Sequence, residues 1–263
     1  MTYLALRIAR SALRRPETHH YGTNSRQIAD LHVPLGPGPH PVAVVLHGGY
    51  WQQPYGKLVM RPLCHDLVRR GWAAWNVEYR RLGKEGGGWP ATFDDVAAAI
   101  DHLPAVGDGT LDLRRVTPVG HSAGGQLALW SAARTSFPAG APGASPRVEV
   151  ERVLALGTVC DLTRAGNIAR RLLGGSAEEV PERWALADPM RRVPLDVPVA
   201  LVHARNDETV SVENSRDYAV AARAAGGDVT LIEPVGGHRD PIDPSSTAWA
   251  AGAAWLEGRA LPR

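Results

Sequence analysis

Short apolar runs alternate along this chain with segments of helical spacing, and this alternation restricts the possible folds more than any other feature of the sequence. The runs predicted as strands cover residues 42–46, 72–77, 115–119, 150–159, 198–203 and 228–233. The predicted helices cover residues 57–70, 93–103, 125–134, 211–225 and 245–257. Short runs that are apolar throughout are typical of strands buried on both faces. The sequence therefore predicts an α/β fold, a mostly parallel central sheet with helices on both faces.

Three further segments complete the predicted organisation. Residues 1–15 have the pattern of an amphipathic helix, and residues 26–33 partly alternate, as an edge strand does. Residues 161–195 lack a strand pattern and predict a small helical cap insertion. Because 263 residues suffice for one large core but not comfortably for two, we expect a single domain that spans residues 1–263.

Charge and cysteine content argue against several classes of protein. The formal net charge is only +2, and the basic residues are scattered, whereas nucleic-acid-binding proteins concentrate them on one face. No segment approaches the roughly 18 apolar residues of a membrane span, and residues 1–15 lack the pattern of a secretion signal. Cys64 and Cys160 form no C-x-x-C motif of a zinc or redox site. We expect a cytoplasmic protein with no metal, cofactor, nucleic-acid or membrane partner; the sequence allows a homodimer.

The stretch Gly-His-Ser-Ala-Gly at residues 120–124 fits the pattern G-x-S-x-G between a predicted strand and a predicted helix. That strand–turn–helix setting is typical of a nucleophile elbow. The glycines permit a tight turn, because a side chain there would meet neighbouring backbone. The turn exposes Ser122 at a helix N-terminus, where N–H groups favour negative charge. We therefore predict Ser122 as a nucleophile; the alternative is a surface turn of small residues.

A nucleophilic serine needs a base, and the base needs a group that orients it. His238 and Asp207 each follow a predicted strand, so both lie at the sheet edge that carries Ser122. Asp161 competes with Asp207 because it also follows a strand, and Asp240 lies two residues from His238. We favour Asp207 as the acid, since its strand comes directly before the strand of the histidine.

The motif H-G-G-Y-W at residues 47–51 ends the strand at 42–46. Acyl transfer creates an oxyanion, which requires N–H donors aimed at it. One donor is expected from the residue after the nucleophile, Ala123, and others from this loop. By position we assign Gly49 and Tyr50 as those donors, and we expect His47 to fix the loop by hydrogen bonding.

Large aromatic residues lie near the predicted site in the sequence. Trp51 and Trp89, together with Tyr50, are predicted to line a pocket for an aromatic substrate. The alternative is that these side chains pack in the core or at its rim, as large aromatic residues commonly do.

Two stretches carry a family resemblance: residues 47–52 (HGGYWQ) and 120–130 (GHSAGGQLALW). They resemble the kynurenine formamidase and hormone-sensitive-lipase-like carboxylesterase branch of the α/β-hydrolase superfamily. H-G-G-x-W is specific to formamidase-like members, and many carboxylesterases share the elbow. The resemblance covers roughly residues 27–257 and implies the α/β-hydrolase fold with the triad already assigned. Two features depart from it: Tyr50 replaces the third glycine of H-G-G-G, and GGGWP stands at 86–90.

We therefore expect a serine hydrolase that cleaves a small carboxylic ester or an arylformamide through an acyl-enzyme on Ser122. A general short-chain carboxylesterase or lipase-like esterase is the first alternative. A peptidase of the prolyl-oligopeptidase type usually brings a large accessory domain, for which 263 residues leave no room. A non-catalytic ligand-binding protein on the same scaffold generally loses a triad member, whereas this sequence keeps all three.

Overall fold

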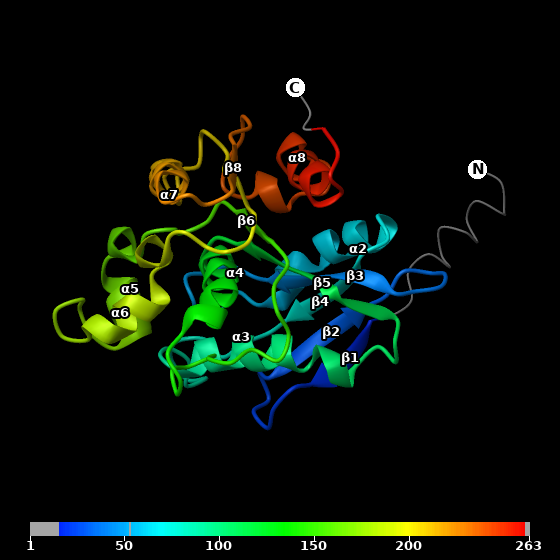
Figure 1. The fold of residues 1–263 in the computed structure, drawn as a ribbon, viewed down its shortest axis with the longest axis horizontal. Helices are drawn as coiled ribbons and strands as arrows, with labels where there is room; N and C mark the ends of the chain where they lie inside the picture. Colours follow the sequence, from blue (N-terminus) through cyan, green and yellow to red (C-terminus); the bar gives the residue numbers. More distant parts are fainter. Residues whose placement is uncertain (1–15, 53, 261–263) are drawn as a thin grey trace.

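The central sheet has eight strands in the order β1-β2-β4-β3-β5-β6-β7-β8 in this computed structural model, which describes residues 16–52 and 54–260 (Figure 1). The strands are β1 (Glu17–His20), β2 (Ile28–His32), β3 (His40–Leu46), β4 (Ala73–Val77), β5 (Leu111–His121), β6 (Val153–Leu156), β7 (Val199–Val202) and β8 (Val229–Ile232). All pairs from β4 to β8 are parallel, whereas the β1–β2 and β2–β4 pairs are antiparallel. The mostly parallel sheet predicted from the sequence is confirmed.

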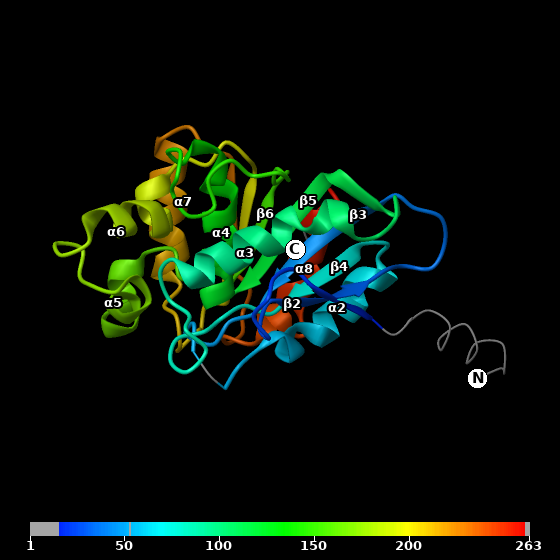
Figure 2. The same ribbon diagram turned by 90° about the horizontal axis from the view of Figure 1, so that it is seen from below.

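Helices cover both faces of this sheet (Figure 2). One face carries α2 (Arg61–Arg69) and α8 (Thr247–Leu256), and the other carries α3 (Ala91–Asp101), α4 (Ala123–Ala132) and α7 (Glu213–Ala224). Successive side chains of a strand point to opposite faces. In β3, Val42, Val44 and Leu46 therefore pack in one core, while Ala43 and Val45 pack in the other. Burial on both faces explains why this run is apolar throughout.

The sequence prediction was wrong about the edge of the sheet. The predicted edge strand at 26–33 contains β2, but β2 pairs with β1 on one side and β4 on the other. The edge is β1, whose sequence Glu-Thr-His-His is polar and largely exposed. A polar strand of four residues has no apolar alternation, so it gave no signal. The helix predicted at residues 1–15 lies outside the described residues.

The segment between β6 and β7 contains short helices and no strand, as predicted for the insertion at 161–195. Its elements are η4 (Leu162–Ala165), α5 (Asn167–Leu173), α6 (Pro181–Ala187) and η5 (Pro189–Arg192). It lies beside α4 and α7 at one end of the molecule (Figures 1 and 2). Elsewhere, the short 3₁₀ helices are η1 (Lys57–Met60), η2 (Leu103–Ala105), η3 (Ala133–Ser136) and η6 (Asp240–Ile242). Within the described ranges, no helix is both long and apolar enough to cross a membrane.

The register of the parallel strands brings the predicted site residues to one edge. The last residues of β5, β6, β7 and β8 are level, because His121 pairs with Leu156, Leu156 with Val202, and Val202 with Ile232. The chain leaves the sheet at the same edge after each of these strands. Open α/β sheets place their binding sites at this edge.

Candidate active site

Ser122 lies in the sharp turn between β5 and α4. Its backbone has φ 54° and ψ −118°, a combination that is strained for any residue other than glycine. The turn leaves no room for side chains beside the serine. A Cβ on Gly120 would lie 2.1 Å from the carbonyl oxygen of Gly124, and one on Gly124 would lie 2.2 Å from that of Leu46. The two glycines of the motif are therefore required by the close approach of backbone to backbone.

His238 and Asp207 form a hydrogen-bonded pair at the same edge. Nδ1 of His238 donates to Oδ2 of Asp207 over 2.7 Å, and the backbone N–H groups of Thr209 and Val210 donate to Oδ1 over 2.9 and 2.8 Å. Burial alone would raise the pKa of this carboxyl. Hydrogen bonds from His203, His238 and the Val210 N–H outweigh burial and hold the pKa of Asp207 well below its usual range. The group beside His238 is therefore a carboxylate.

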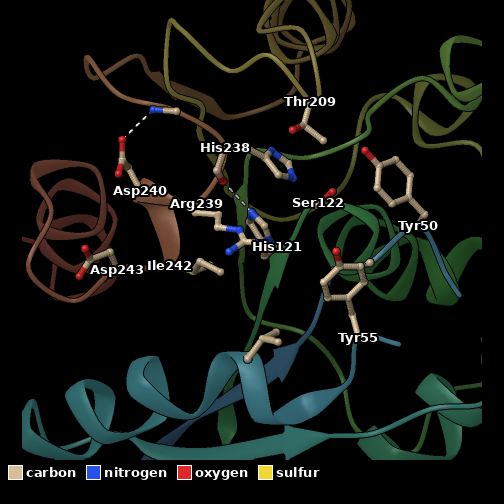
Figure 3. A pocket seen from close by; sticks show the side chains of 14 residues that line it. Tyr50, Tyr55, His121, Ser122, Thr209, His238, Arg239, Asp240, Ile242 and Asp243 are labelled. Atoms are coloured by element: carbon tan, nitrogen blue, oxygen red, sulfur yellow. Dashed lines mark hydrogen bonds between the residues drawn. The ribbon is translucent and has the colours of Figure 1, made fainter. Parts of the chain in front are cut away.

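Ser122 and His238 line the same cavity, which has a volume of about 840 Å³ and is called the histidine cavity below. Figure 3 shows the imidazole of His238 turned toward the hydroxyl of Ser122. The structure thus brings together the three residues that the sequence selected from segments far apart in the chain.

The two competing carboxylates are engaged elsewhere. Oδ1 of Asp161 accepts hydrogen bonds from the backbone N–H and the hydroxyl of Thr163, so this residue caps η4. Oδ2 of Asp240 accepts the N–H of Gly237 over 2.6 Å and shapes the loop that carries His238. The carboxylate paired with the histidine ring is that of Asp207.

The loop after β3 passes close to Ser122. A Cβ on Gly48 would lie 2.9 Å from the carbonyl oxygen of His121 and 3.0 Å from the Cβ of Ser122, so a larger residue could not fit here without a shift of the backbone. Gly49, Tyr50 and Trp51 have φ values of 116°, 55° and 54°, a run of left-handed residues that turns the chain sharply. The predicted oxyanion-hole residues Gly49, Tyr50 and Ala123 therefore border the space around Ser122.

A second, smaller cavity of about 280 Å³ meets the histidine cavity at Ser122. Ser122, Tyr50 and Thr209 line both. The other residues that line the smaller cavity are Trp51, Ala123, Val159, Arg164, Ala165, Ile168, Val210, Ser211 and Asn214. Three of these residues, from 164 to 168, belong to the insertion between β6 and β7, so this space is called the insertion cavity.

The two tryptophans predicted to bind substrate have different surroundings. Trp51 is only 1% exposed, donates from Nε1 to Oε1 of Gln126 over 3.1 Å, and lines the insertion cavity. Trp89 lines neither cavity and instead packs on Phe93 with ring centroids 5.0 Å apart. The partly buried side chain of Trp89 packs against the core that α3 and α4 share, so its role in binding a substrate stays a prediction.

Two residues of the site, His121 and Tyr55, were not predicted from the sequence. Nε2 of His121 donates to the carbonyl oxygen of His238 over 2.8 Å, and the two rings lie 4.6 Å apart. Burial, and then the nearby His238, lower the pKa of His121 to about 3, so its ring is neutral. It occupies the variable position before Ser122, where the motif gives no signal. Tyr55 is half-exposed and lines the histidine cavity beside Tyr50 (Figure 3).

Neither cysteine forms a disulfide. Cys64 and Cys160 are buried free thiols, and burial raises the pKa of both far above the ordinary value. Among residues 16–52 and 54–260, no group of three or more histidine, cysteine, aspartate or glutamate side chains is arranged to hold a metal ion.

The parallel sheet, the helices on both faces and the strand–serine–helix turn together define a protein of the α/β-hydrolase fold, as predicted. The sequence profile of the BD-FAE family matches residues 29–221, which is well over half of the chain. The chain belongs to the BD-FAE family. Among curated protein sequences, none matches it.

Solved structures of several esterases have this fold. A truncated carbohydrate esterase from gut microbiota has a TM-score of 0.79 and 20% identity, over 94% of this chain and 96% of that one. Esterase 2 of the Planctomycetes species Thermogutta terrifontis, bound to butyrate, has a TM-score of 0.75 and 20% identity, over 92% of each chain. Esterase B of Lactobacillus rhamnosis, inhibited by a tributyrin phosphonate, has a TM-score of 0.78 and 21% identity, over 97% of this chain and 91% of that one. At these identities the likeness establishes the fold.

Proposed function

We propose that this protein is a serine hydrolase in which Ser122 is the nucleophile, His238 the general base and Asp207 the acid that orients the base. The observation that carries the proposal is the 2.7 Å hydrogen bond between Asp207 and His238, in the cavity that Ser122 lines from a strained turn. The structural neighbours described as esterases and the family membership support the same class of reaction.

The proposed reaction proceeds through an acyl-enzyme. His238 takes the hydroxyl proton of Ser122 as its oxygen attacks the substrate carbonyl, and Asp207 keeps the imidazole in the tautomer that can accept it. The resulting oxyanion accepts hydrogen bonds from the N–H groups of Ala123, Gly49 and Tyr50. His238 then gives the proton to the leaving group. Water, activated by the same histidine, releases the acid and restores Ser122.

The two cavities have different roles in this reaction. Because the leaving group takes its proton from His238, it must extend into the histidine cavity, and the acyl group extends away from it into the insertion cavity. At about 280 Å³ the insertion cavity is the smaller of the two. The butyrate-bound and tributyrin-phosphonate-inhibited neighbours support a short acyl group in this space.

The histidine cavity suits a larger leaving group. Tyr50 and Tyr55 supply aromatic surface, while Arg239, Asp240 and Asp243 supply polar groups from the loop that carries the histidine (Figure 3). Mixed apolar and polar linings of this kind orient a ligand by a few hydrogen bonds over a larger contact area. An ester of a hydroxyl-rich alcohol fits this lining, and one structural neighbour is described as a carbohydrate esterase.

Hydrolysis of an arylformamide is the second candidate function. The motif H-G-G-Y-W at 47–51 resembles that of formamidase-like enzymes, and a formyl group is the smallest acyl group that the insertion cavity can take. Tyr50 and Tyr55 would then flank the aromatic amine that leaves.

A panel of substrates tests both candidates. We expect kcat/KM to fall at least tenfold from acetyl to octanoyl p-nitrophenyl esters, because methylenes gain about 1–3 kcal/mol each only where an apolar channel receives them. N-formylkynurenine and an acetylated sugar, assayed in parallel, distinguish the two leaving groups. Ser122→Ala supplies the background rate. A preference for octanoyl esters, with no activity on N-formylkynurenine or the sugar, would contradict the small-acyl proposal and favour a lipase-like esterase.

A second test concerns the glycine beneath the proposed acid and base. Gly157 has φ +50°, and a Cβ there would lie 3.3 Å from Oδ2 of Asp207 and 3.3 Å from Nδ1 of His238. Gly157→Ala is expected to cost about 1–2 kcal/mol of stability, from the left-handed backbone, and to lower kcat roughly tenfold or more by displacing the pair. Thermal unfolding measures the loss of stability, and hydrolysis of p-nitrophenyl acetate measures the loss of kcat.

Gly258→Ala is the matched control for Gly157→Ala. Gly258 has φ +65° with nothing within 4 Å of the added Cβ, so alanine there meets a similar backbone strain without touching the pair. The Gly258→Ala variant should be less stable than the wild type but have the same kcat. Equal kcat in the two variants would mean that the position of the pair does not limit the rate.

A further inference from the structure

His47, the first residue of the loop beside Ser122, has a hydrogen-bond acceptor on each ring nitrogen. The side chain is fully buried. Its Nε2 lies 3.0 Å from Oε1 of Glu78, and its Nδ1 lies 2.7 Å from the carbonyl oxygen of Gly48. A neutral imidazole has one N–H donor, whereas imidazolium has two. The carbonyl of Gly48 can only accept, and so can Glu78 when it is ionised; with an ionised Glu78, both contacts are hydrogen bonds only if both ring nitrogens of His47 carry a proton.

The other contacts of Glu78 support an ionised carboxylate. Oε2 accepts the backbone N–H of Lys57 over 3.2 Å, and Oε1 accepts that of Tyr79 over 3.3 Å. Nε of Arg81 lies 3.8 Å from Oε1. Burial alone would raise the pKa of Glu78, but the hydrogen bond with His47, the charge of Arg81 and the hydrogen bond from the Lys57 N–H hold it below its usual value.

The neighbouring charged groups have partners of their own. Arg81 forms two hydrogen bonds of 2.8 Å with the carboxylate of Glu85, and Nζ of Lys57 pairs with Asp30. Against the other side of His47 lies the ring of Tyr79, stacked at 4.2 Å and nearly parallel. The negative face of an aromatic ring favours a cation. Glu78 and the face of Tyr79 thus supply the surroundings that a buried imidazolium needs.

We propose that His47 is held as an imidazolium by Glu78 and acts, through the carbonyl of Gly48, as a positioning residue for the oxyanion hole. The carbonyl of Gly48 and the N–H of Gly49 belong to one peptide unit. A charged donor on that carbonyl fixes the peptide plane, and it also draws electron density away from the nitrogen. The N–H of Gly49 thereby becomes a stronger donor. This inference rests on the proposed function, in which that N–H faces the oxyanion.

The protonation state is tested directly on the wild-type protein. Long-range ¹H–¹⁵N spectra of histidine-labelled protein, at a pH of about 8 and thus above the ordinary histidine value, should show two protonated ring nitrogens for His47. His121 is the internal control, since its ring is neutral and donates from Nε2 to His238. The His47→Gln variant assigns the signals. A neutral His47 ring in this spectrum would overturn the proposal.

Glu78→Gln tests the effect on the reaction, because it keeps the shape of the side chain and removes its charge. Oxyanion stabilisation acts on the transition state, so kcat is expected to fall about tenfold or more with KM little changed. Glu85→Gln is the matched control: it removes a buried carboxylate of the same network that pairs with Arg81. It should leave kcat within about twofold. Equal losses in both variants, or none in Glu78→Gln, would overturn the positioning role.

The outcomes separate this inference from the proposed function. If wild-type protein neither hydrolyses esters nor reacts at Ser122, the proposed function fails, while the spectrum still decides the charge of His47. If the wild type is active and its His47 is neutral, the proposed function stands and this inference fails. The spectrum of the wild type also decides the charge should Glu78→Gln not fold.

Discussion

Replacing Asp207 with asparagine is expected to lower kcat by roughly four orders of magnitude, the loss that this substitution causes in the triad of serine proteases. The carboxylate accepts Nδ1–H of His238 over 2.7 Å and thereby leaves Nε2 free to take the serine proton. An amide at that position can donate as well as accept, which allows the wrong tautomer of the ring. The measurement is kcat for a short-chain p-nitrophenyl ester, with circular dichroism to verify folding.

Asp161→Asn is the matched control for Asp207→Asn, since this carboxylate also follows a strand of the sheet. Asp161 caps η4 through Thr163 and has no part in the proposed mechanism. We expect its replacement to change kcat by no more than a few fold. If Asp161→Asn proves the more damaging variant, the acid of the triad has been assigned to the wrong residue.

The sequence predicted those parts of the molecule that depend on strong local patterns. Runs that are apolar throughout located the inner strands, because a strand buried on both faces cannot carry polar side chains. Gly120 and Gly124 identified the elbow, because the backbone around Ser122 leaves no room for a Cβ. Asp207 and His238 followed from the order of the strands, since the carboxyl ends of parallel neighbours share one edge.

The parts that escaped prediction depend on contacts between distant segments. His121 reaches the carbonyl of His238 from 117 residues away, and its position in the motif accepts any residue. The polar strand β1 pairs through its backbone, which leaves no trace in the side-chain pattern. Trp89 gives the same signal in the sequence whether it faces a substrate or packs on Phe93. Only the direction of the side chain decides between the two.

The protonation state of His47 shows the same limit. The sequence indicated that this histidine fixes the loop, and its hydrogen bond to the carbonyl of Gly48 agrees with that prediction. The second acceptor, Glu78, directly follows β4 and lies 31 residues further along the chain. Which ring nitrogens of His47 carry a proton depends on the pairing with Glu78. The sequence of the loop does not indicate that pairing.

The nucleophile is the central element of the proposed mechanism, and Ser122→Ala removes only its hydroxyl. Ser122 is 5% exposed at the junction of the two cavities, and its turn is formed by backbone contacts that alanine retains. The variant should therefore fold while losing hydrolysis of p-nitrophenyl acetate. Ser131→Ala is the matched control, because Ser131 is a buried serine within α4 whose hydroxyl donates to the carbonyl of Ala128.

The most direct measurement is mass spectrometry of the protein after reaction with a fluorophosphonate. We predict one added group on the wild type and on Ser131→Ala, located on the peptide that contains Ser122, and none on Ser122→Ala. Labelling of Ser122→Ala at the wild-type rate, or a wild-type protein that takes up no label while folded, would contradict the assignment of Ser122 as the nucleophile.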